Sequence, residues 1–400
     1  MHRLSTALGM PQHRFASTHV VGTNGKSSVT RMVAALLEAH GVSCGACVSP
    51  HPLRWSERVL VGGKEIGEAE FAAAVERTAQ AAEMVNRSLE EGEAVTQFEV
   101  ATAAAFVAFA SAGVEAAVVE AGLGGRLDAT NTIPSRVTVL TSIGLDHTAW
   151  LGETELEIAA EKLAVLRDHT TLVLGRVGPE VAALAERTAA EHGAKLIVAP
   201  EDPGEGVELR ATGGFQRRNF ALARAAAEAF LGELDDARVA AVAETLTVPG
   251  RLERVAENPP TYLDAAHNPD GATALAEGLR EIAGERPVVA CIAVLAEKDA
   301  GAMIAALTPP VTHLVCTKLP ADGPEIRHIG VFQARRQSLA ADVLAGSAAG
   351  GGVEVEAIEN FEAAVARARE RALVLDGILL VTGSHYVLAP ARATLRLWQD

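Results

Sequence analysis

The sequence contains few cysteines, few aromatic residues, more negative than positive charge and no long apolar run. Its 400 residues include 51 acidic and 35 basic side chains, which give a formal charge of −16. This charge repels polyanions, so we expect no nucleic-acid partner. No apolar run reaches the about 18 residues of a membrane span, and the first residues show no cleavage site. We therefore expect no membrane association and a cytoplasmic location.

The cysteines raise one question of chemistry, because Cys44 and Cys47 form a C-x-x-C pair. Such a pair can ligate a metal ion or carry out redox reactions. No second C-x-x-C or C-x-x-H follows to complete a zinc site. The surrounding stretch VSCGACVS, residues 42–49, is also typical of a buried strand in a reducing compartment, and we favour that interpretation.

Aromatic residues make up only 4% of the chain against 49% hydrophobic residues, so packing must rest on Ala, Leu and Val. Short β-rich runs alternate with Ala-rich helical stretches, which predicts α/β layers around a mainly parallel sheet. The predicted strands are residues 18–21, 115–120, 136–142, 171–174, 195–199, 261–266, 287–295, 313–319, 353–358 and 377–383. Predicted helices include residues 27–40, 98–110 and 217–230.

Residues 20–28, VVGTNGKSS, place a glycine-rich turn between a predicted strand and a predicted helix. Such a turn presents backbone N–H groups to phosphate oxygens, while its lysine neutralises phosphate charge and a hydroxyl reaches Mg²⁺. The full P-loop pattern would require glycine at Val20, so the match is to the shorter form G-x-x-G-K-S. An ordinary βα turn is the alternative. The predicted phosphate-binding residues are Gly22, Thr23, Asn24, Gly25, Lys26, Ser27 and Ser28.

Polar residues also follow two other predicted strands. Glu120 ends one strand ahead of a glycine-rich stretch that leads to Asp128, and His147 follows the end of another. Because active groups in open parallel sheets gather at the carboxyl ends of strands, we expect Glu120 and His147 within reach of Mg²⁺ on a bound nucleotide. Taken singly, His147 could be a histidine at the edge of the core, and Asp128 a helix cap.

Several short motifs follow one another along nearly the whole chain: GTNGK, SPHPLRWSERV, FEVATAAAF, EAGLGGRLDATN, SIGLDHTAWLG, EIAAEK, PGR, DAAHNPDG and GSHYVL. In this order they resemble the folylpolyglutamate synthase and dihydrofolate synthase family, within the Mur ligases. The resemblance implies that ATP phosphorylates a carboxylate of dihydropteroate or of a tetrahydrofolate-type substrate. The amino group of L-glutamate then attacks the acyl phosphate, which gives an amide, ADP and phosphate. ATP and two Mg²⁺ ions are the implied cofactors.

We therefore predict an α/β protein with a P-loop NTPase-like parallel-sheet N-terminal domain and a smaller Rossmann-like α/β C-terminal domain. The prolines and charges around residues 247–260 indicate a hinge. The predicted divisions are an ATP-binding domain of the Mur-ligase central type at 1–247, the hinge at 248–256, and a glutamate-ligase domain of the Mur-ligase C-terminal type at 257–400.

The resemblance also implies roles for single residues in catalysis and metal binding. Lys26 resembles the phosphate-binding lysine, and Lys162 matches a lysine that the family carries as a carbamate, whose oxygens help to place a second Mg²⁺. An exposed helical lysine paired with nearby acids is the alternative for Lys162. The predicted catalytic residues are Lys26, Asp128, His147 and Lys162. The predicted metal ligands are Ser28, Ser49, Glu120, His147 and Lys162.

Other residues resemble those that hold ATP and the pterin. Asn219, Arg251, Asp264 and His267 match family residues that hold ATP, although Arg251 could also be a surface arginine near a loop. Residues 49–59 resemble the loop that covers the pterin site. There Trp55 is expected to stack on the ring, unless it is only a plug, and Arg54 or Arg58 to meet a carboxylate. Asp128 is expected to orient substrate or metal-bound water.

Two positions depart from the family pattern. Ser27 replaces the usual glycine after the lysine, and Phe215 replaces the histidine usual before Gln216. Serine in place of glycine changes the backbone freedom of the loop, and Phe215 lacks a polar contact near the nucleotide. These departures concern the range of substrates.

Two other functions fit parts of the sequence. Another Mur-type ligase, acting on a non-folate carboxylate such as a peptidoglycan precursor, would share the nucleotide residues. It would also need a UDP-sugar-binding domain, for which we expect no room before the phosphate loop. A non-catalytic ATP-dependent switch would bind nucleotide without glutamate-dependent ADP release. We expect a monomer that acts on small molecules.

Overall fold

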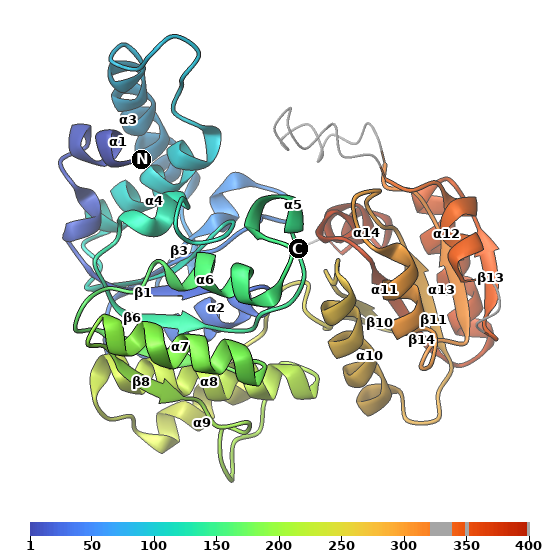
Figure 1. The fold of residues 1–400 in the computed structure, drawn as a ribbon. Coiled ribbons are helices and arrows are strands. Elements are labelled where there is room, and N and C mark those ends of the chain that lie inside the picture. Colours follow the sequence, from blue (N-terminus) through green and yellow to red (C-terminus); the bar gives the residue numbers. More distant parts are fainter. Residues whose placement is uncertain (321–337, 349–351, 398–400) are drawn as a thin grey trace. The chain divides into compact units, whose positions relative to one another are not determined.

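The computed structural model describes residues 1–320, 338–348 and 352–397 (Figure 1). The chain divides into two compact units, and each belongs to the α/β class that the sequence predicts. The first unit contains Met1–Leu209 and Arg217–Leu246, and the second contains Arg210–Gln216 and Thr247–Asp400. The predicted domain bounds and hinge stay predictions.

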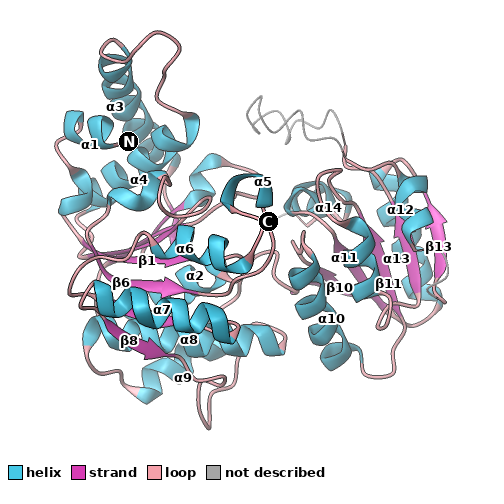
Figure 2. Ribbon diagram, in the orientation of Figure 1, coloured by secondary structure: helices cyan, strands magenta, loops and turns pink. Residues whose placement is uncertain are grey.

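The first unit is built on an eight-stranded sheet with the order β4-β3-β2-β5-β1-β6-β7-β8. Figure 2 shows β1, β6 and β8 of this sheet among the helices of the unit. All strands from β2 to β8 in this order run parallel, and β3 and β4 are antiparallel additions at one edge. The strands are β1 Ala16–Val21, β2 Cys44–Cys47, β3 Val59–Val61, β4 Lys64–Glu65, β5 Ala116–Glu120, β6 Ser135–Leu140, β7 Thr171–Leu174 and β8 Lys195–Val198. The predicted parallel sheet is confirmed.

Helices connect these strands in the crossover pattern of a parallel sheet. The helices are α1 His2–Ala7, α2 Lys26–Ala39, α3 Glu68–Asn86, α4 Gln97–Ala112, α5 Thr148–Leu151, α6 Glu155–Leu163, α7 Pro179–Glu191, α8 Gly214–Leu231 and α9 Asp236–Thr245. Short 3₁₀ helices span η1 Pro11–His13, η2 Trp55–Arg58 and η3 Ala129–Thr132. Of the helices, α4 begins with a capping box, in which Thr96 and Glu99 satisfy each other's backbone N–H groups.

The core of the first unit shows how a chain with few aromatic residues packs. Phe106 and Phe109 of α4 are fully buried, and Phe15 packs edge-on against Phe109. Gly45 in β2 lies directly beneath Phe109, since a Cβ at this glycine would lie 2.5 Å from the ring carbon Cδ1. The small residue in the strand therefore makes room for the large one on the helix.

The C-x-x-C pair lies in this same strand. Cys44 and Cys47 are both buried in β2, and residues three apart along a strand point to opposite faces of the sheet. Burial raises the pKa of the Cys47 thiol to about 12. The favoured interpretation of VSCGACVS as a buried strand is confirmed, and the opposed directions of the thiols do not suit a shared metal ion.

The second unit contains a six-stranded sheet with the order β13-β12-β11-β14-β10-β9, in which only β9 is antiparallel to its neighbour among the described strands. Its strands are β9 Glu253–Glu257, β10 Pro260–Leu263, β11 Val288–Ile292, β12 His313–Cys316, β13 Glu354–Ala357 and β14 Ile378–Thr382. Its helices are α10 Pro269–Ala283, α11 Ala300–Leu307, α12 Ala341–Ser347, α13 Phe361–Val374 and α14 Leu388–Thr394, with the 3₁₀ helix η5 at His385–Val387. Apolar clusters join α10, α11 and α12 to one face, and α13 and α14 to the other.

Several elements differ from the sequence-based expectation. The strands predicted at 261–266, 287–295 and 313–319 end earlier, at Leu263, Ile292 and Cys316. The strand predicted at 136–142 ends at Leu140, because Thr141 and Ser142 leave the sheet to hold the neighbouring loop. The segment 253–257, in the predicted hinge region, forms the edge strand β9.

No helix in the described part of the chain has the length and apolar character needed to cross a membrane. The predicted cytoplasmic location and monomeric state stay predictions.

Candidate functional site

The phosphate loop, residues 22–25, follows β1 and is held by the segment that follows β6. The Thr23 N–H donates to the Ser142 carbonyl at 2.8 Å, and the Asn24 N–H donates to the Ser142 hydroxyl at 3.0 Å. The Thr141 hydroxyl donates to the Asn24 carbonyl at 2.6 Å. The loop is therefore fixed from outside its own sequence, which leaves its shape formed before a ligand arrives.

Two glycines of this loop could not be replaced without strain. Gly22 has a φ of +148°, and a Cβ there would lie 1.9 Å from Thr141 Oγ1. Gly25 has a φ of +84°, and its Cβ would lie 2.7 Å from Asn219 Oδ1. Only glycine fits both the positive φ and the close approach. The same packing places Asn219, a predicted nucleotide residue of α8, beside the loop.

Lys26 begins α2, and its side chain bends back over the loop. Its Nζ donates to the Gly22 carbonyl at 3.0 Å and to the Thr23 carbonyl at 3.1 Å. The ammonium thus lies at a helix N-terminus, where backbone N–H groups and the helix dipole already favour anions. This arrangement fits the phosphate groups of a nucleotide.

Glu120, at the end of β5, joins the first turn of α2 to the segment that follows β2. Its Oε1 accepts the Ser27 hydroxyl at 2.9 Å, and its Oε2 accepts the Ser49 N–H at 2.9 Å. The Ser27 hydroxyl also lies 3.3 Å from the Ser49 carbonyl. Carboxylate and hydroxyl oxygens beside a phosphate site are ligands that suit Mg²⁺. Glu120 is 2% exposed, so a cation would compensate its buried charge.

Ser28 lies in the same helical turn but is not joined to Glu120. It is 1% exposed, and its hydroxyl has no hydrogen-bond partner within the described residues. The structure therefore places Ser27, rather than Ser28, with two of the predicted metal ligands, Ser49 and Glu120. The metal-binding role of Ser28 stays a prediction.

Asp128 closes the glycine-rich loop that follows β5. Its Oδ2 accepts the Leu123 N–H at 2.8 Å, and its Oδ1 accepts the Thr130 N–H at 2.9 Å and the Thr130 hydroxyl. It caps η3, so the cap expected as the alternative interpretation is present. Burial raises the pKa of this carboxyl, and the bonds from Leu123 and Thr130 oppose the shift.

A buried histidine lies behind Asp128. His19 of β1 is fully buried, and its Nε2 lies 2.8 Å from the Thr130 hydroxyl oxygen. Because that hydroxyl donates to Asp128, His19 Nε2 must be the protonated nitrogen and donate to it. Burial lowers the pKa of His19 to about 3, with the positive charge of Arg167 adding to the shift. The sequence analysis did not include His19 among the site residues. Its position in the strand that leads into the phosphate loop could have indicated it.

Lys162, on α6, is 4% exposed. It is therefore not the exposed helical lysine of the alternative interpretation. Burial, and then the nearby charge of Lys26, lower the pKa of Lys162 to about 7, while Asp146 and Asp128 act in the opposite direction. Gly125 packs against the helix here, since a Cβ at this glycine would lie 2.9 Å from Lys162 Cα. The charges of Lys26, Asp128 and Asp146 therefore all act on the Lys162 side chain.

His147 follows Asp146 and has a φ of +53°. Residues other than glycine seldom adopt a positive φ, and those that do are often found at functional sites. Its backbone N–H donates to Asp146 Oδ1 at 2.9 Å, and its ring Nε2 lies 3.8 Å from the same oxygen. The side chain is 30% exposed. Sequence reasoning left Asp146 outside the site residues, although it directly precedes His147.

In the predicted pterin loop, residues 49–59, the side chains of His51, Trp55 and Arg58 pack against one another. The Arg58 Nε donates to His51 Nδ1 at 2.8 Å, and the Arg58 guanidinium lies 4.4 Å from the centre of the Trp55 ring. The rings of His51 and Trp55 are 4.7 Å apart. Arg54 is instead paired with Glu65 at 3.0 Å, and it is half exposed. Of the two candidate arginines, Arg54 is the more accessible to a ligand carboxylate.

Three predicted nucleotide residues lie in the second unit. Asp264, after β10, accepts the Leu252 N–H at 2.7 Å and the Ala266 N–H at 2.7 Å. Burial raises the pKa of Asp264, and the nearby charges of Arg251 and His267 act against this shift. These three residues therefore form one group around the turn after residue 250. Asn219 and the phosphate loop belong to the first unit.

Phe215, which departs from the family pattern, is an apolar packing residue of the second unit. It packs on the cluster that contains Leu252 and Leu279. A Cβ at Gly278 would lie 2.8 Å from Leu252 and 3.3 Å from Phe215. The aromatic ring thus contributes to the core that supports the turn carrying Arg251.

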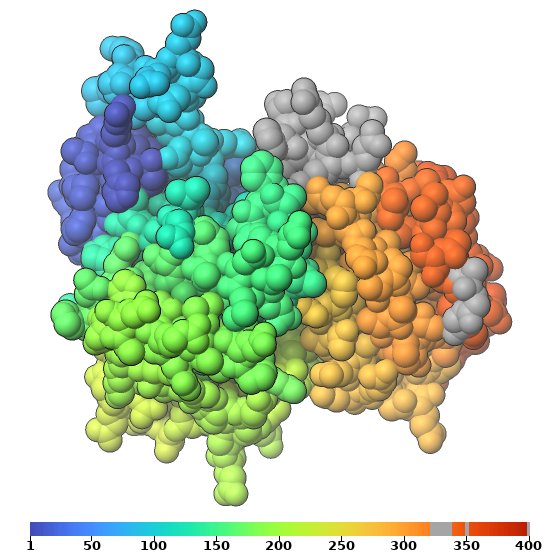
Figure 3. All heavy atoms as spheres, in the orientation of Figure 1, coloured from blue at the N-terminus to red at the C-terminus, as the bar shows by residue number. Residues whose placement is uncertain are grey.

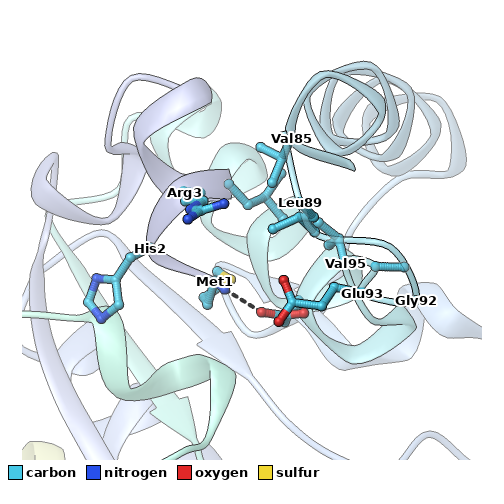
Figure 4. A pocket seen from close by; sticks show the side chains of 11 residues that line it. Met1, His2, Arg3, Val85, Leu89, Gly92, Glu93 and Val95 are labelled. Carbon is cyan, nitrogen blue, oxygen red and sulfur yellow. Dashed lines mark hydrogen bonds and ion pairs between the residues drawn. The ribbon is translucent and has the colours of Figure 1, made fainter. Parts of the chain in front are cut away.

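A separate hollow of about 600 Å³ lies in the first unit, beside α1, α3 and the loop after α3. Figure 3 shows the light-blue atoms of α3 and that loop projecting from the surface. Val85, Leu89 and Val95 line it, and the amino group of Met1 forms an ion pair with Glu99 there (Figure 4). None of the predicted site residues lines this hollow.

Known proteins resemble this chain over both units. Residues 20–202 match the Mur ligase middle domain, and residues 250–385 match the Mur ligase, glutamate ligase domain. The dihydrofolate synthase/folylpolyglutamate synthase of Mycobacterium tuberculosis is 37% identical over 356 residues, 78% of this chain and 72% of that protein. The Bacillus subtilis protein of the same name is 30% identical over 423 residues, 99% of this chain and 94% of that protein.

Solved structures show the same fold. The folylpolyglutamate synthase of Mycobacterium tuberculosis, complexed with ADP and AMPPCP, is similar with a TM-score of 0.88 and 33% identity, over 100% of this chain and 95% of that one. A bifunctional folylpolyglutamate synthase/dihydrofolate synthase with Mn, AMPPNP and L-glutamate bound gives a TM-score of 0.81 and 28% identity. That match covers 99% of this chain and 94% of the other.

Proposed function

The chain belongs to the folylpolyglutamate synthase/dihydrofolate synthase family of Mur ligases, and from this membership we propose that it is an ATP-dependent ligase. It joins L-glutamate to the carboxylate of a pterin or folate through an acyl phosphate. The observation that carries the proposal is the meeting of Lys26, the glycine loop and the Ser27–Glu120–Ser49 group at adjoining strand ends. Relatives with bound ADP and with bound Mn, AMPPNP and L-glutamate support it.

The chemistry requires an anionic acceptor to meet an anionic nucleotide. A free carboxylate is a poor acyl donor because its leaving group would be oxide, and phosphorylation supplies a better one. Lys26 and the N-terminus of α2 reduce the repulsion between the partners by holding phosphate charge. Glu120 and Ser49 would hold Mg²⁺, which neutralises the charge of the transferred phosphoryl group.

Lys162 is proposed to carry a carbamate. An ammonium at this buried place faces the charge of Lys26, whereas a carbamate would attract it. The anionic oxygens of a carbamate would, with His147, provide ligands for a second divalent ion. Incubation with isotopically labelled bicarbonate, followed by NMR of the labelled carbon, tests the modification. Lys162→Met should abolish the signal, and a signal unchanged in this variant would contradict the proposal.

Arg251, Asp264 and His267 of the second unit are proposed to bind ATP, and residues 248–256 are proposed to be a hinge. Arg251, held in a group with Asp264 and His267, is suited to contact phosphate with its guanidinium fork. Residues 49–59 are proposed to cover the pterin, with Arg54 the more accessible partner for its carboxylate. Asp128 is proposed to orient the substrate from the loop that it closes.

The function is tested by measuring ADP release from ATP, Mg²⁺ and L-glutamate, with dihydropteroate or tetrahydrofolate added separately. We expect ADP release that needs both L-glutamate and one of these acceptors. Binding of ATP without turnover on either acceptor would point to a non-catalytic switch. Turnover supported only by a non-folate carboxylate would point to another Mur-type ligase.

A further inference from the structure

Ser27 differs from the glycine usual in the family, and its hydroxyl contacts the carboxylate proposed to bind metal. Its Oγ donates to Glu120 Oε1 at 2.9 Å and lies 3.3 Å from the Ser49 carbonyl. A hydroxyl has a single proton, so the shorter and charge-assisted bond to Glu120 is the stronger of the two. The second Glu120 oxygen accepts the Ser49 N–H at 2.9 Å. Donors from two separate elements therefore hold the two carboxylate oxygens.

A carboxylate that is held in one orientation loses less freedom when a cation binds. Glu120 ends β5, which lies between β1 and β2 in the sheet, and its own backbone is paired with Val20 of β1. The remaining freedom is that of its side chain. A glycine at residue 27 would leave Oε1 without the donor that now orients it.

We propose that Ser27 is a positioning residue that orients the Glu120 carboxylate for a divalent cation, so that this chain binds the cation more tightly than it would with glycine there. The inference rests on the proposed metal site of the ligase.

The test measures Mn²⁺ binding directly, by the electron paramagnetic resonance signal of free Mn²⁺ in the presence of ADP. Ser27→Ala and Ser27→Gly should raise the Kd for Mn²⁺ roughly tenfold, the size expected for a hydrogen bond to a charged group. Ser27→Thr keeps the hydroxyl and should restore most of the affinity. Ser88→Ala, which removes a hydroxyl that donates to the Val85 carbonyl, is the remote control.

The outcomes separate positioning from other effects. Unchanged Mn²⁺ affinity in Ser27→Ala, or tighter binding, would overturn the proposal. If Ser27→Gly is weakened and Ser27→Ala is not, the cause is backbone freedom and the proposal also fails. Thermal unfolding and metal-free ADP binding check that each variant is folded. Because Mn²⁺ binding is measured without turnover, an inactive wild-type protein would count against the ligase function and leave this measurement intact.

Discussion

Two buried carboxylates at strand ends, Glu120 in the first unit and Asp264 in the second, are held in different ways. Asp264 accepts backbone N–H groups from Leu252 and Ala266, which lie close to it in the chain. Glu120 accepts a side-chain hydroxyl from Ser27 and an N–H from the distant Ser49. The donors to Asp264 belong to one local turn, whereas the donors to Glu120 come from two separate elements and orient its carboxylate beside the phosphate loop. We infer that Asp264 chiefly maintains the shape of its turn, and that Glu120 is oriented to bind a cation.

The largest expected effect concerns Lys26, the lysine that begins α2 and covers the phosphate loop. Replacing Lys26 with alanine removes the charge on the phosphate loop and should lower kcat by about two to three orders of magnitude, as for a lost charge-stabilising donor. Glutamate-dependent ADP release measures the loss, and circular dichroism checks the fold. Lys64→Ala, which removes an exposed lysine of β4, is the matched control. Turnover equal to that of the wild type would remove Lys26 from its assigned role.

A second substitution tests whether Glu120 serves to bind a cation rather than to stabilise the fold. Glu120→Gln keeps the shape and removes the negative charge, so it should lower turnover at limiting Mg²⁺ by roughly a hundredfold. Its unfolding midpoint in urea should stay close to that of the wild type, because the uncharged amide relieves a buried charge. Glu115→Gln, one strand position before β5, is the control. A large loss of stability with full activity would reverse the roles assigned to Glu120 and Asp264.

The third substitution tests Asp264 as the structural member of the pair. Asp264→Ala leaves the Leu252 and Ala266 N–H groups without this acceptor, which should cost about 2 to 3 kcal/mol of unfolding free energy. Asp264→Asn keeps one acceptor oxygen and should cost less. Hydrogen exchange resolved by peptide should show the loss in the second unit. Asp376→Asn, at a carboxyl that is 99% exposed, serves as control. Protection equal to the wild type in Asp264→Ala would refute the structural role.

The smallest effect concerns Asp128, a third buried carboxylate, through the histidine behind it. The pKa of His19 is lowered to about 3, so the ring is neutral in the fold and takes up a proton on unfolding below its ordinary pKa of 6.5. This contribution to stability is complete above pH 6.5 and is lost as the pH falls. Between pH 7 and pH 5 the loss should be about 2 kcal/mol.

Urea unfolding at several pH values measures how steeply the free energy of unfolding falls as the pH is lowered. His19→Gln keeps a donor for the Thr130 hydroxyl but does not titrate, so its stability should fall less steeply over the same range. An identical slope in the wild type and in His19→Gln would show that another group causes the pH dependence.

Much of the site was predictable because it depends on local patterns. The glycines and lysine of residues 22–26 specify a turn before a helix, and the parallel sheet brings the end of β5 beside the end of β1. The β-branched and apolar runs predicted the strands for the same reason. The roles of the individual site residues stay predictions.

Other features were not predictable from local patterns. The choice between Ser27 and Ser28 depends on the direction of each side chain from the first turn of α2, and both are serines. Arg58 was a candidate for the substrate carboxylate, but the fold places it on Trp55 and His51. The burial of Lys162 follows from the close approach of Gly125, in a loop distant along the chain.

The sequence by itself determined the α/β alternation, the glycine turn and the order of the polar strand ends, because these depend on periodicity and on backbone conformations that few residues can adopt. Only the tertiary structure decided which hydroxyl meets Glu120, which lysine is buried and which carboxylates are held by backbone groups. These depend on distances between elements far apart in the chain, and packing in three dimensions sets those distances.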